Sequence, residues 1–174
     1  HVTGVQTCAL PICGAEELGI TVCGTDALPY PTAELTWALI LGLARHIPHE
    51  DANMRAGGHW QTRVGIDLHG RTLGLLGLGT LGSRVARVGQ AFGMKAIAWS
   101  NNLAPERCRE LGVEYVGKDE LVARSDVLSI HTQLSRRTEG LIDTPEFERM
   151  KRTAWLINTS RGHIVREAAL VDAL

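Results

Sequence analysis

The segment TLGLLGLGTLGSRVARVGQAFGMKAIAWS (72–100) carries the pattern from which the fold class follows. It begins with an apolar run at 72–77, which is typical of a strand buried on both faces. The glycine-rich GLGTLG (77–82), a helical pattern over 80–92 and a second apolar run at 95–100 follow. Strand, glycine turn, helix and strand in this order predict a βαβ unit with two parallel strands.

The same alternation continues outside this unit. The sequence predicts a short strand and turn at 19–25, and a more polar helix with a Gly-rich loop over 49–65. Between them it predicts an apolar helix at 33–47, whose continuous apolar run indicates burial on more than one face. Further along it predicts a helix at 104–112, a strand at 114–116, a helix at 118–125, a strand at 126–132, a helix at 144–150 capped by Thr144, a strand at 153–160, and a helix from near Arg166. Strands and helices at this spacing predict an α/β fold with a doubly wound parallel sheet of the Rossmann type.

Composition excludes several classes of protein. The 174 residues include 18 lysines and arginines against 19 aspartates and glutamates, so no basic excess exists to neutralise a phosphate backbone. A hydrophobic content of 44% argues against a disordered chain. No run of roughly 18 apolar residues occurs, which is the length a membrane span needs. We therefore expect a cytoplasmic globular protein with no nucleic-acid partner and no membrane partner.

The four cysteines indicate neither disulfides nor a metal. Cys8, Cys13, Cys23 and Cys108 form no CxxC pair and no zinc set with nearby histidines. We expect a reduced protein without a metal site.

Both ends of the sequence are unusual. Residues 2–12, VTGVQTCALPI, resemble the translation of a common sequencing-library adapter. A signal peptide is the alternative, but no basic residue precedes the apolar stretch. We therefore expect residues 1–12 to be an artefact. Because REAALVDAL (166–174) stops without a helix cap, we also expect the chain to be an internal piece of a longer protein.

The glycine loop matches G-x-G-x-x-G in the context that gives this motif its meaning. Gly77 permits the tight turn, Gly79 lets the backbone approach a pyrophosphate, and Gly82 allows close packing of helix and strand. The backbone N–H groups of Thr80, Leu81 and Gly82 then face the phosphates at a helix N-terminus. A glycine-rich turn without a ligand is the alternative, and the βαβ context favours a dinucleotide.

The end of the second strand bears on the choice between NAD and NADP. An acidic residue that binds the ribose hydroxyls is expected there, but Ser100, Asn101 and Asn102 occupy the place. Ser100 and Asn101 can hydrogen-bond ribose hydroxyls, and none of the three is a cation that would bind a 2′-phosphate. The sequence favours NAD and leaves NADP possible.

Two further residues lie at predicted strand ends. Arg161, in INTSRGHIV (157–165), offers a fork of donors suited to a carboxylate or a polarised carbonyl, with a surface arginine beside a turn as the alternative. His131 closes the strand at 126–132, where a histidine is more often structural than catalytic.

Four segments together resemble the D-isomer-specific 2-hydroxyacid dehydrogenases, near the phosphoglycerate dehydrogenase-like branch. They are TAELTWALILGLAR (32–45), GIDLHGRTLGLLGLGTLGSRVARVGQAFGMKAIAWS (65–100), SDVLSIHTQLSRRTEGLI (125–142) and LINTSRGHIVREAAL (156–170). The resemblance implies a two-domain enzyme that transfers hydride between a nicotinamide cofactor and a D-2-hydroxy acid or 2-oxo acid. It implies that 13–29 are the tail of the substrate-binding domain and that 30–174 are an NAD-binding domain incomplete at its C-terminus.

The resemblance also assigns roles to residues. Arg161 is implied to be catalytic, and the cofactor is implied to be lined by Gly77, Gly79, Thr80, Leu81, Gly82, Ser100, Asn101, Gln133, Leu134, Thr138, Thr159, Ser160 and Arg161. The family's general acid/base is a histidine paired with a glutamate, both downstream of the arginine motif. Glu167 and His163 lie too close to that motif to serve. We therefore expect this chain alone to bind cofactor weakly and not to turn over.

Two departures and several alternatives remain. The family often has an acid where Ser100 stands and usually one where Arg166 stands, so Arg166 is interpreted as tolerated. Some members of the superfamily are NAD-sensing corepressors, and an adenosylhomocysteinase-like hydrolase is a third possibility that the NTSRG turn argues against. The apolar helix at 33–47 is either buried within the monomer or part of a homodimer interface, as the family usually dimerises through this domain. The identity of the 2-hydroxy acid is left open.

Overall fold

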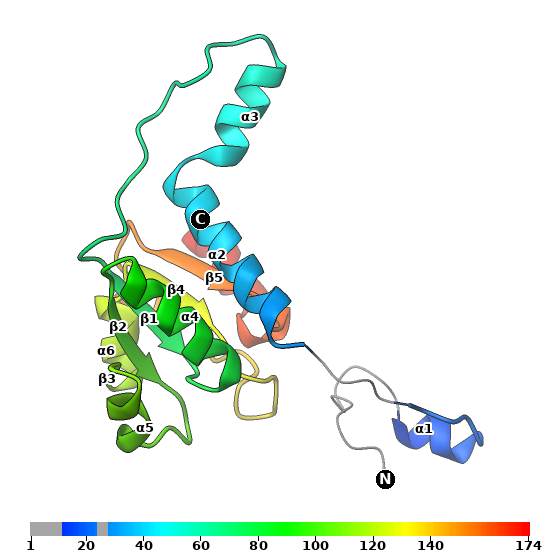
Figure 1. The fold of residues 1–174 in the computed structure, drawn as a ribbon. Coiled ribbons are helices and arrows are strands. Elements are labelled where there is room, and N and C mark those ends of the chain that lie inside the picture. Colours follow the sequence, from blue (N-terminus) through cyan, green and yellow to red (C-terminus); the bar gives the residue numbers. More distant parts are fainter. Residues whose placement is uncertain (1–11, 24–27) are drawn as a thin grey trace.

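The computed structural model describes residues 12–23 and 28–174 and contains one five-stranded, fully parallel sheet (Figure 1). The strands are β1 (Thr72–Leu76), β2 (Lys95–Trp99), β3 (Glu114–Tyr115), β4 (Val127–Ile130) and β5 (Trp155–Asn158). Their order across the sheet is β3-β2-β1-β4-β5. The order reverses direction between β1 and β4, which confirms the predicted doubly wound, Rossmann-type sheet.

Helices cover both faces of the sheet. In chain order they are α1 (Ile12–Glu17), α2 (Tyr30–Ala44), α3 (Ile47–Arg55), α4 (Thr80–Ala91), α5 (Pro105–Glu110), α6 (Lys118–Arg124), α7 (Thr144–Arg149) and α8 (Glu167–Ala173), with a short 3₁₀ turn at Gly162–Ile164. Helices α2 and α4 cross one face together, and α6 packs against the other (Figure 1).

The core divides into two clusters because successive strand side chains point to opposite faces. Leu73 and Leu75 of β1 pack with Trp37 and Ile40 of α2. Leu76, one residue further along β1, belongs to the other cluster, which is completed by Leu121 and Val122 of α6 and by Ile130 of β4. These strands are predominantly apolar on both sides because both faces of the sheet are covered, and the one polar residue within β4, Ser129, is buried as well.

Helix α2 buries only one of its faces, which corrects the expectation drawn from its apolar run. Its buried residues are Ala33, Thr36, Trp37, Ile40 and Ala44. Leu35, Leu39 and Leu43 share another face at a spacing of four residues and remain 53%, 43% and 45% exposed. The apolar run therefore makes both a core face and an uncovered apolar face.

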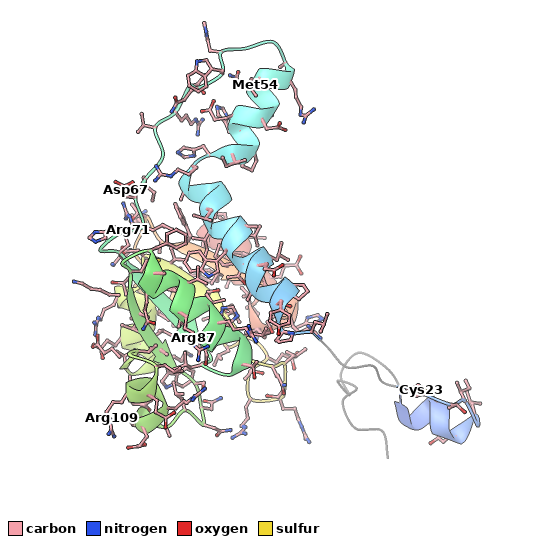
Figure 2. The ribbon with its side chains drawn as sticks, in the orientation of Figure 1. Cys23, Met54, Asp67, Arg71, Arg87 and Arg109 are labelled. Atoms are coloured by element: carbon pink, nitrogen blue, oxygen red, sulfur yellow. The ribbon has the colours of Figure 1, made fainter. Side chains whose placement is uncertain are left out.

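Helix α3 and the strand-free return at 56–67 form an arm that stands away from the sheet (Figure 1). No residue of α3 is buried, and Met54 lies at the far end of the arm (Figure 2). The Glu50 carboxylate closes the arm by accepting hydrogen bonds from the backbone N–H groups of Thr62 and Arg63. The arm is therefore shaped by local hydrogen bonds and not by a core.

Two local predictions were wrong. No strand forms at Gly19–Cys23, and residues 24–27 of the predicted strand, like residues 1–11 of the expected artefact, lie outside the described part of the chain. Asp143, not Thr144, caps α7: its side chain accepts from the Thr144 N–H, while Glu146 accepts from the Asp143 N–H. A capping box satisfies two backbone donors at once, which one threonine cap would not.

Arg166 has a structural role that the sequence did not reveal. Its Nε lies 3.1 Å from an Asp143 carboxylate oxygen, and its backbone N–H donates to Ile142. The side chain thus ties the start of α8 to the segment that precedes α7.

In the described residues no helix is both long enough and apolar enough to cross a bilayer.

Candidate nucleotide-binding site

The glycine loop lies where the strand order reverses, at the carboxyl ends of β1, β2 and β4. The Gly77 N–H donates to Trp99 at the end of β2, and the His131 N–H donates to Leu76 at the end of β1. These bonds hold three strand ends and the loop together. Open α/β sheets bind their ligands in this position.

Two of the three loop glycines are required by close backbone contacts. Gly77 has φ +105°, and a Cβ there would lie 3.0 Å from the backbone of His131. A Cβ at Gly82 would lie 2.1 Å from the Gly77 carbonyl oxygen. Neither neighbour can move without moving a strand end, so both positions exclude a side chain.

Gly79 differs from its neighbours. It is the N-cap of α4, and a Cβ there would meet nothing within 4 Å. The space above it is open, and the first N–H groups of α4, from Thr80 and Leu81 to Gly82, have no partners within the helix. An open cradle at the N-terminus of a 12-residue helix fits a pyrophosphate.

The end of β2 carries no carboxylate. Ser100 is half-buried, Asn101 and Asn102 are exposed, and the Ser100 carbonyl accepts from the Leu103 N–H. Glu106, the first acid after the strand, forms an ion pair with Arg109 at 2.6 Å. The ribose end of the site therefore offers neutral hydrogen-bonding groups.

The loop that follows β4 is closed by Thr138. Its buried hydroxyl donates to the Gln133 carbonyl at 2.6 Å and accepts from the Ser135 N–H at 2.7 Å. Gln133 is exposed and Leu134 half-buried at the start of the loop. The hydroxyl of Thr138, a residue predicted to line the cofactor, thus forms hydrogen bonds within the loop that fix the loop's shape.

The turn after β5 carries Arg161 at the same edge of the sheet. Asn158 bridges the turn, accepting from the Ser160 N–H and donating to the Arg161 carbonyl. The Ser160 hydroxyl donates to the Thr132 carbonyl at 2.6 Å, which fixes the turn to the end of β4. Arg161 is exposed, so its guanidinium reaches the surface of the site from a firmly held backbone.

Thr159 connects the same turn to α2. Its hydroxyl lies 2.9 Å from the Thr36 hydroxyl, which also donates to the Thr32 carbonyl one helical turn back. Thr36 is fully buried. The sequence analysis missed this residue, although a polar side chain on the buried face of an apolar helix signals a buried partner.

His131 lies beneath the glycine loop and not in the open site. Its Nε2 is 2.8 Å from the Ser129 hydroxyl, and its buried Nδ1 has no partner within the described residues. A Cβ at Gly82 would lie 3.6 Å from the His131 Cβ. Burial lowers the pKa of His131 to about 4, so the ring is neutral at pH 7.

The geometry brings most of the predicted residues to one edge of the sheet. They are Gly77, Gly79, Thr80, Leu81 and Gly82 in the glycine loop, Ser100 and Asn101 after β2, Gln133, Leu134 and Thr138 after β4, and Thr159, Ser160 and Arg161 after β5. The contact of each with a cofactor stays a prediction. In the described part of the chain, no group of three His, Cys, Asp or Glu side chains is placed to hold a metal.

Comparison with known proteins gives one consistent result. The family model described as D-isomer specific 2-hydroxyacid dehydrogenase, NAD binding domain, matches residues 37–174. A glyoxylate reductase of Aeropyrum pernix is 46% identical over 169 residues, covering 92% of this chain and 50% of that protein. A glyoxylate reductase of Korarchaeum cryptofilum is 39% identical over 166 residues, with the same shares.

Solved structures agree with the sequence relatives. A phosphoglycerate oxidoreductase from Vibrio cholerae superposes with a TM-score of 0.88 at 35% identity, covering 98% of this chain and 55% of that one. A D-lactate dehydrogenase from Aquifex aeolicus, complexed with NAD and lactic acid, superposes with a TM-score of 0.82 at 32% identity, covering 99% and 52%. The chain therefore spans about half the length of the proteins that it matches.

Proposed function

Because the chain belongs to the D-isomer-specific 2-hydroxyacid dehydrogenase family, whose NAD-binding domain it carries, we propose that it is the nucleotide half of a dehydrogenase. The whole protein would transfer hydride between a nicotinamide cofactor and C2 of a D-2-hydroxy acid or 2-oxo acid. The observation that supports this proposal most is that the glycine loop (77–82) and the turn that carries Arg161 lie in the same part of the fold. Both lie at the carboxyl edge of one sheet, and Ser160 ties the turn to the strand next to β1.

The residues of the cradle fit NAD. The N–H groups that begin α4 would hold the pyrophosphate, with Gly79 leaving room for it. Ser100 and Asn101 would bind the ribose hydroxyls, and Gln133 and Leu134 would line the cofactor. When bound, NAD supplies or accepts the hydride at its nicotinamide ring.

Arg161 would bind the acid. A guanidinium presents two parallel N–H donors to a carboxylate, and it stabilises the charge that develops on the substrate oxygen as hydride arrives at C2. The backbone bonds of Asn158 and Ser160 fix the turn from which it extends. Orientation by a rigid turn is the contribution that this chain makes to the chemistry.

The proton and the substrate pocket would come from elsewhere in the whole protein. We assign residues 13–29 to the tail of a substrate-binding domain. The resemblance puts the acid/base histidine and its glutamate downstream of the arginine motif, and we assign neither role to His163 or Glu167. Among the described residues, nothing favours a corepressor-like role over this one.

This proposal predicts binding without turnover. Titrated with NADH and followed by energy transfer from tryptophan to the nicotinamide, the chain should show saturable binding with a Kd of about 0.1 to 1 mM. With glyoxylate as substrate, its turnover should stay below about 0.01 s⁻¹, because on this proposal the proton-donating histidine is not supplied by these residues. The variant Arg152→Ala, an exposed arginine before β5, serves as the control and should bind NADH equally. Failure to bind NADH would contradict the nucleotide role, and rapid turnover would contradict the missing relay.

We also propose that the chain forms a homodimer through α2 and the arm. Leu35, Leu39 and Leu43 form an uncovered face of α2, and in the arm that follows it Trp60 and Val64 are 75% and 87% exposed. Large apolar side chains left exposed together on one helix face favour an interaction site. By size-exclusion chromatography with light scattering, the chain should be a dimer and Leu39→Glu a monomer. Val171→Glu, at an apolar residue 66% exposed on α8, should remain dimeric; a monomeric parent chain would contradict the proposal.

A further inference from the structure

Two arginines occupy the tip of the loop after β4. Arg136 and Arg137 are both exposed. Among the residues that the structure describes, neither guanidinium has a carboxylate within ion-pair distance or a hydrogen-bond acceptor. Ten other ion pairs do form in the same part of the chain, so unpaired neighbours on one short loop stand out.

The loop holds these arginines in a fixed place. The Thr138 hydroxyl bonds to both Gln133 and Ser135, and the Thr138 and Glu139 N–H groups donate to the Ser135 carbonyl. The Gly140 N–H donates to His163, which ties the end of the loop to the Arg161 turn. An anion-binding group on such a loop is pre-organised, since little backbone freedom is lost when the ligand arrives.

The topology puts this loop and the ribose end of the site at the same edge of the sheet. Strands β2 and β4 both pair with β1, on opposite sides of it. Neighbouring strands are spaced by about 4.8 Å, so the ends of β2 and β4 lie about 10 Å apart, with the glycine loop between them. The β4 loop and the connection from β2 to α5 emerge at the same edge of the sheet (Figure 1). The arginines are carried by the first of these two segments, and the ribose hydroxyls would meet the second.

The charges at the end of β2 leave room for a phosphate. Ser100 and Asn101 are neutral, and the Glu106 carboxylate is neutralised by Arg109. The other cation on α5 is Arg107, whose guanidinium forms an ion pair with the Glu110 carboxylate at 2.9 Å. In the described chain, the unpaired arginines on the loops bordering this end are therefore those of the β4 loop.

We propose that Arg136 and Arg137 bind the 2′-phosphate of NADP, so that the site accepts NADP as well as NAD. This inference rests on the proposed nucleotide-binding function. Two guanidinium forks match the oxygens and the charge of a phosphomonoester, which the 2′-hydroxyl of NAD lacks. The acid that would repel this phosphate is absent from Ser100, where it would stand.

The test compares two cofactors on the whole 174-residue chain. NADH and NADPH are titrated separately into the parent chain, the Arg136→Ala/Arg137→Ala variant and the Arg152→Ala control. Arg152 is also exposed and unpaired in the described structure, but it precedes β5 and so lies at the opposite edge of the sheet. The parent chain should bind NADPH at least as tightly as NADH. The double variant should lose about tenfold in NADPH affinity and less than about threefold in NADH affinity, while the control changes neither.

Salt provides a second readout. A contact with a doubly charged phosphate is screened, so NADPH affinity in the parent chain should fall more steeply with ionic strength than NADH affinity. The double variant should show equal slopes for both cofactors. The two single variants then divide the effect between Arg136 and Arg137.

Each other outcome is decisive. Binding of NADH without measurable binding of NADPH would overturn this inference and leave the nucleotide-binding function standing. An equal loss of both cofactors in the double variant, with an unchanged far-ultraviolet circular dichroism spectrum, would overturn it too, because the arginines would then not read the 2′ position. Failure of the parent chain to bind either cofactor would instead overturn the nucleotide-binding function on which the inference rests.

Discussion

Gly82→Ala should destabilise the chain by about 3 kcal/mol or more. The added methyl group would lie 2.1 Å from the Gly77 carbonyl oxygen, which is part of the backbone at the end of β1. To relieve the overlap, α4 would have to move off the sheet and uncover the buried side chains Val85 and Ala86. Urea denaturation followed by circular dichroism measures the change in the free energy of unfolding.

Gly79→Ala is the matched control, because it adds the same methyl group three residues earlier. A Cβ at Gly79 meets nothing within 4 Å and φ is −77°, so the variant should unfold within about 0.5 kcal/mol of the parent chain. Its NADH affinity should nevertheless fall by about tenfold or more, since the methyl group occupies the approach of the pyrophosphate. Equal stabilities of the two variants would contradict the packing argument. Unchanged NADH affinity in Gly79→Ala would contradict the position assigned to the pyrophosphate.

The second large effect is a loss of stability in mild acid. Burial lowers the pKa of His131 to about 4, whereas the unfolded chain has the ordinary value of 6.5. Below pH 6.5 the unfolded state therefore binds a proton that the native state does not, and the free energy of unfolding falls as the pH drops. The fall continues until the pH reaches about 4 and amounts to about 3 kcal/mol.

The titration of carboxylates contributes little to the change in stability between pH 6.5 and about pH 4.5. Burial alone would raise the pKa of Asp126, but hydrogen bonds from Lys151 and from the Thr72 N–H outweigh it and lower the pKa below 3.8. The stabilisation from such a group is present above its unfolded pKa and is lost as the pH falls through the still lower folded pKa. The interval from pH 6.5 to about pH 4.5 therefore reports mainly on His131.

Urea denaturation at several pH values tests this directly. His131→Phe keeps an aromatic ring beside Ser129 and cannot titrate, so its stability should be nearly constant over the interval, although lower at pH 7 for loss of the Ser129 hydrogen bond. His59→Gln, on the exposed arm, should keep the full slope of the parent chain. A parent chain whose stability does not change between pH 6.5 and 4.5 would show that His131 is not neutral and buried.

The parts of this structure that depend on local spacing could be predicted from the sequence. The glycines of the loop and the predominantly apolar strands carry their own geometric requirements, so the βαβ unit and the parallel sheet followed from them. The capping error at Thr144 was avoidable, because Asp143 precedes Glu146 by three residues and so has the spacing of a capping box. The strand predicted at 19–25 rested on a short apolar pattern alone, which does not establish a strand without a pairing partner.

Contacts between distant segments could not be predicted in this way. Arg161 could be proposed from its turn, but the bond from Ser160 to Thr132 that fixes the turn joins residues 28 apart in sequence. The apolar run in α2 suggested burial on more than one face, yet only the tertiary structure shows which of its faces the sheet covers. The ion pair of Arg166 with Asp143 likewise depends on how α7 and α8 pack.

The hydrogen bond between Thr36 and Thr159 joins residues 123 apart in sequence. It couples the position of α2 to that of the turn that carries Arg161. Thr159 lies two residues before Arg161, and its short side chain leaves little slack between helix and turn. A shift of α2 along its own axis would therefore change the orientation of the Arg161 guanidinium. In this fold the direction in which Arg161 points is set jointly by the sheet and by a helix from the other end of the chain.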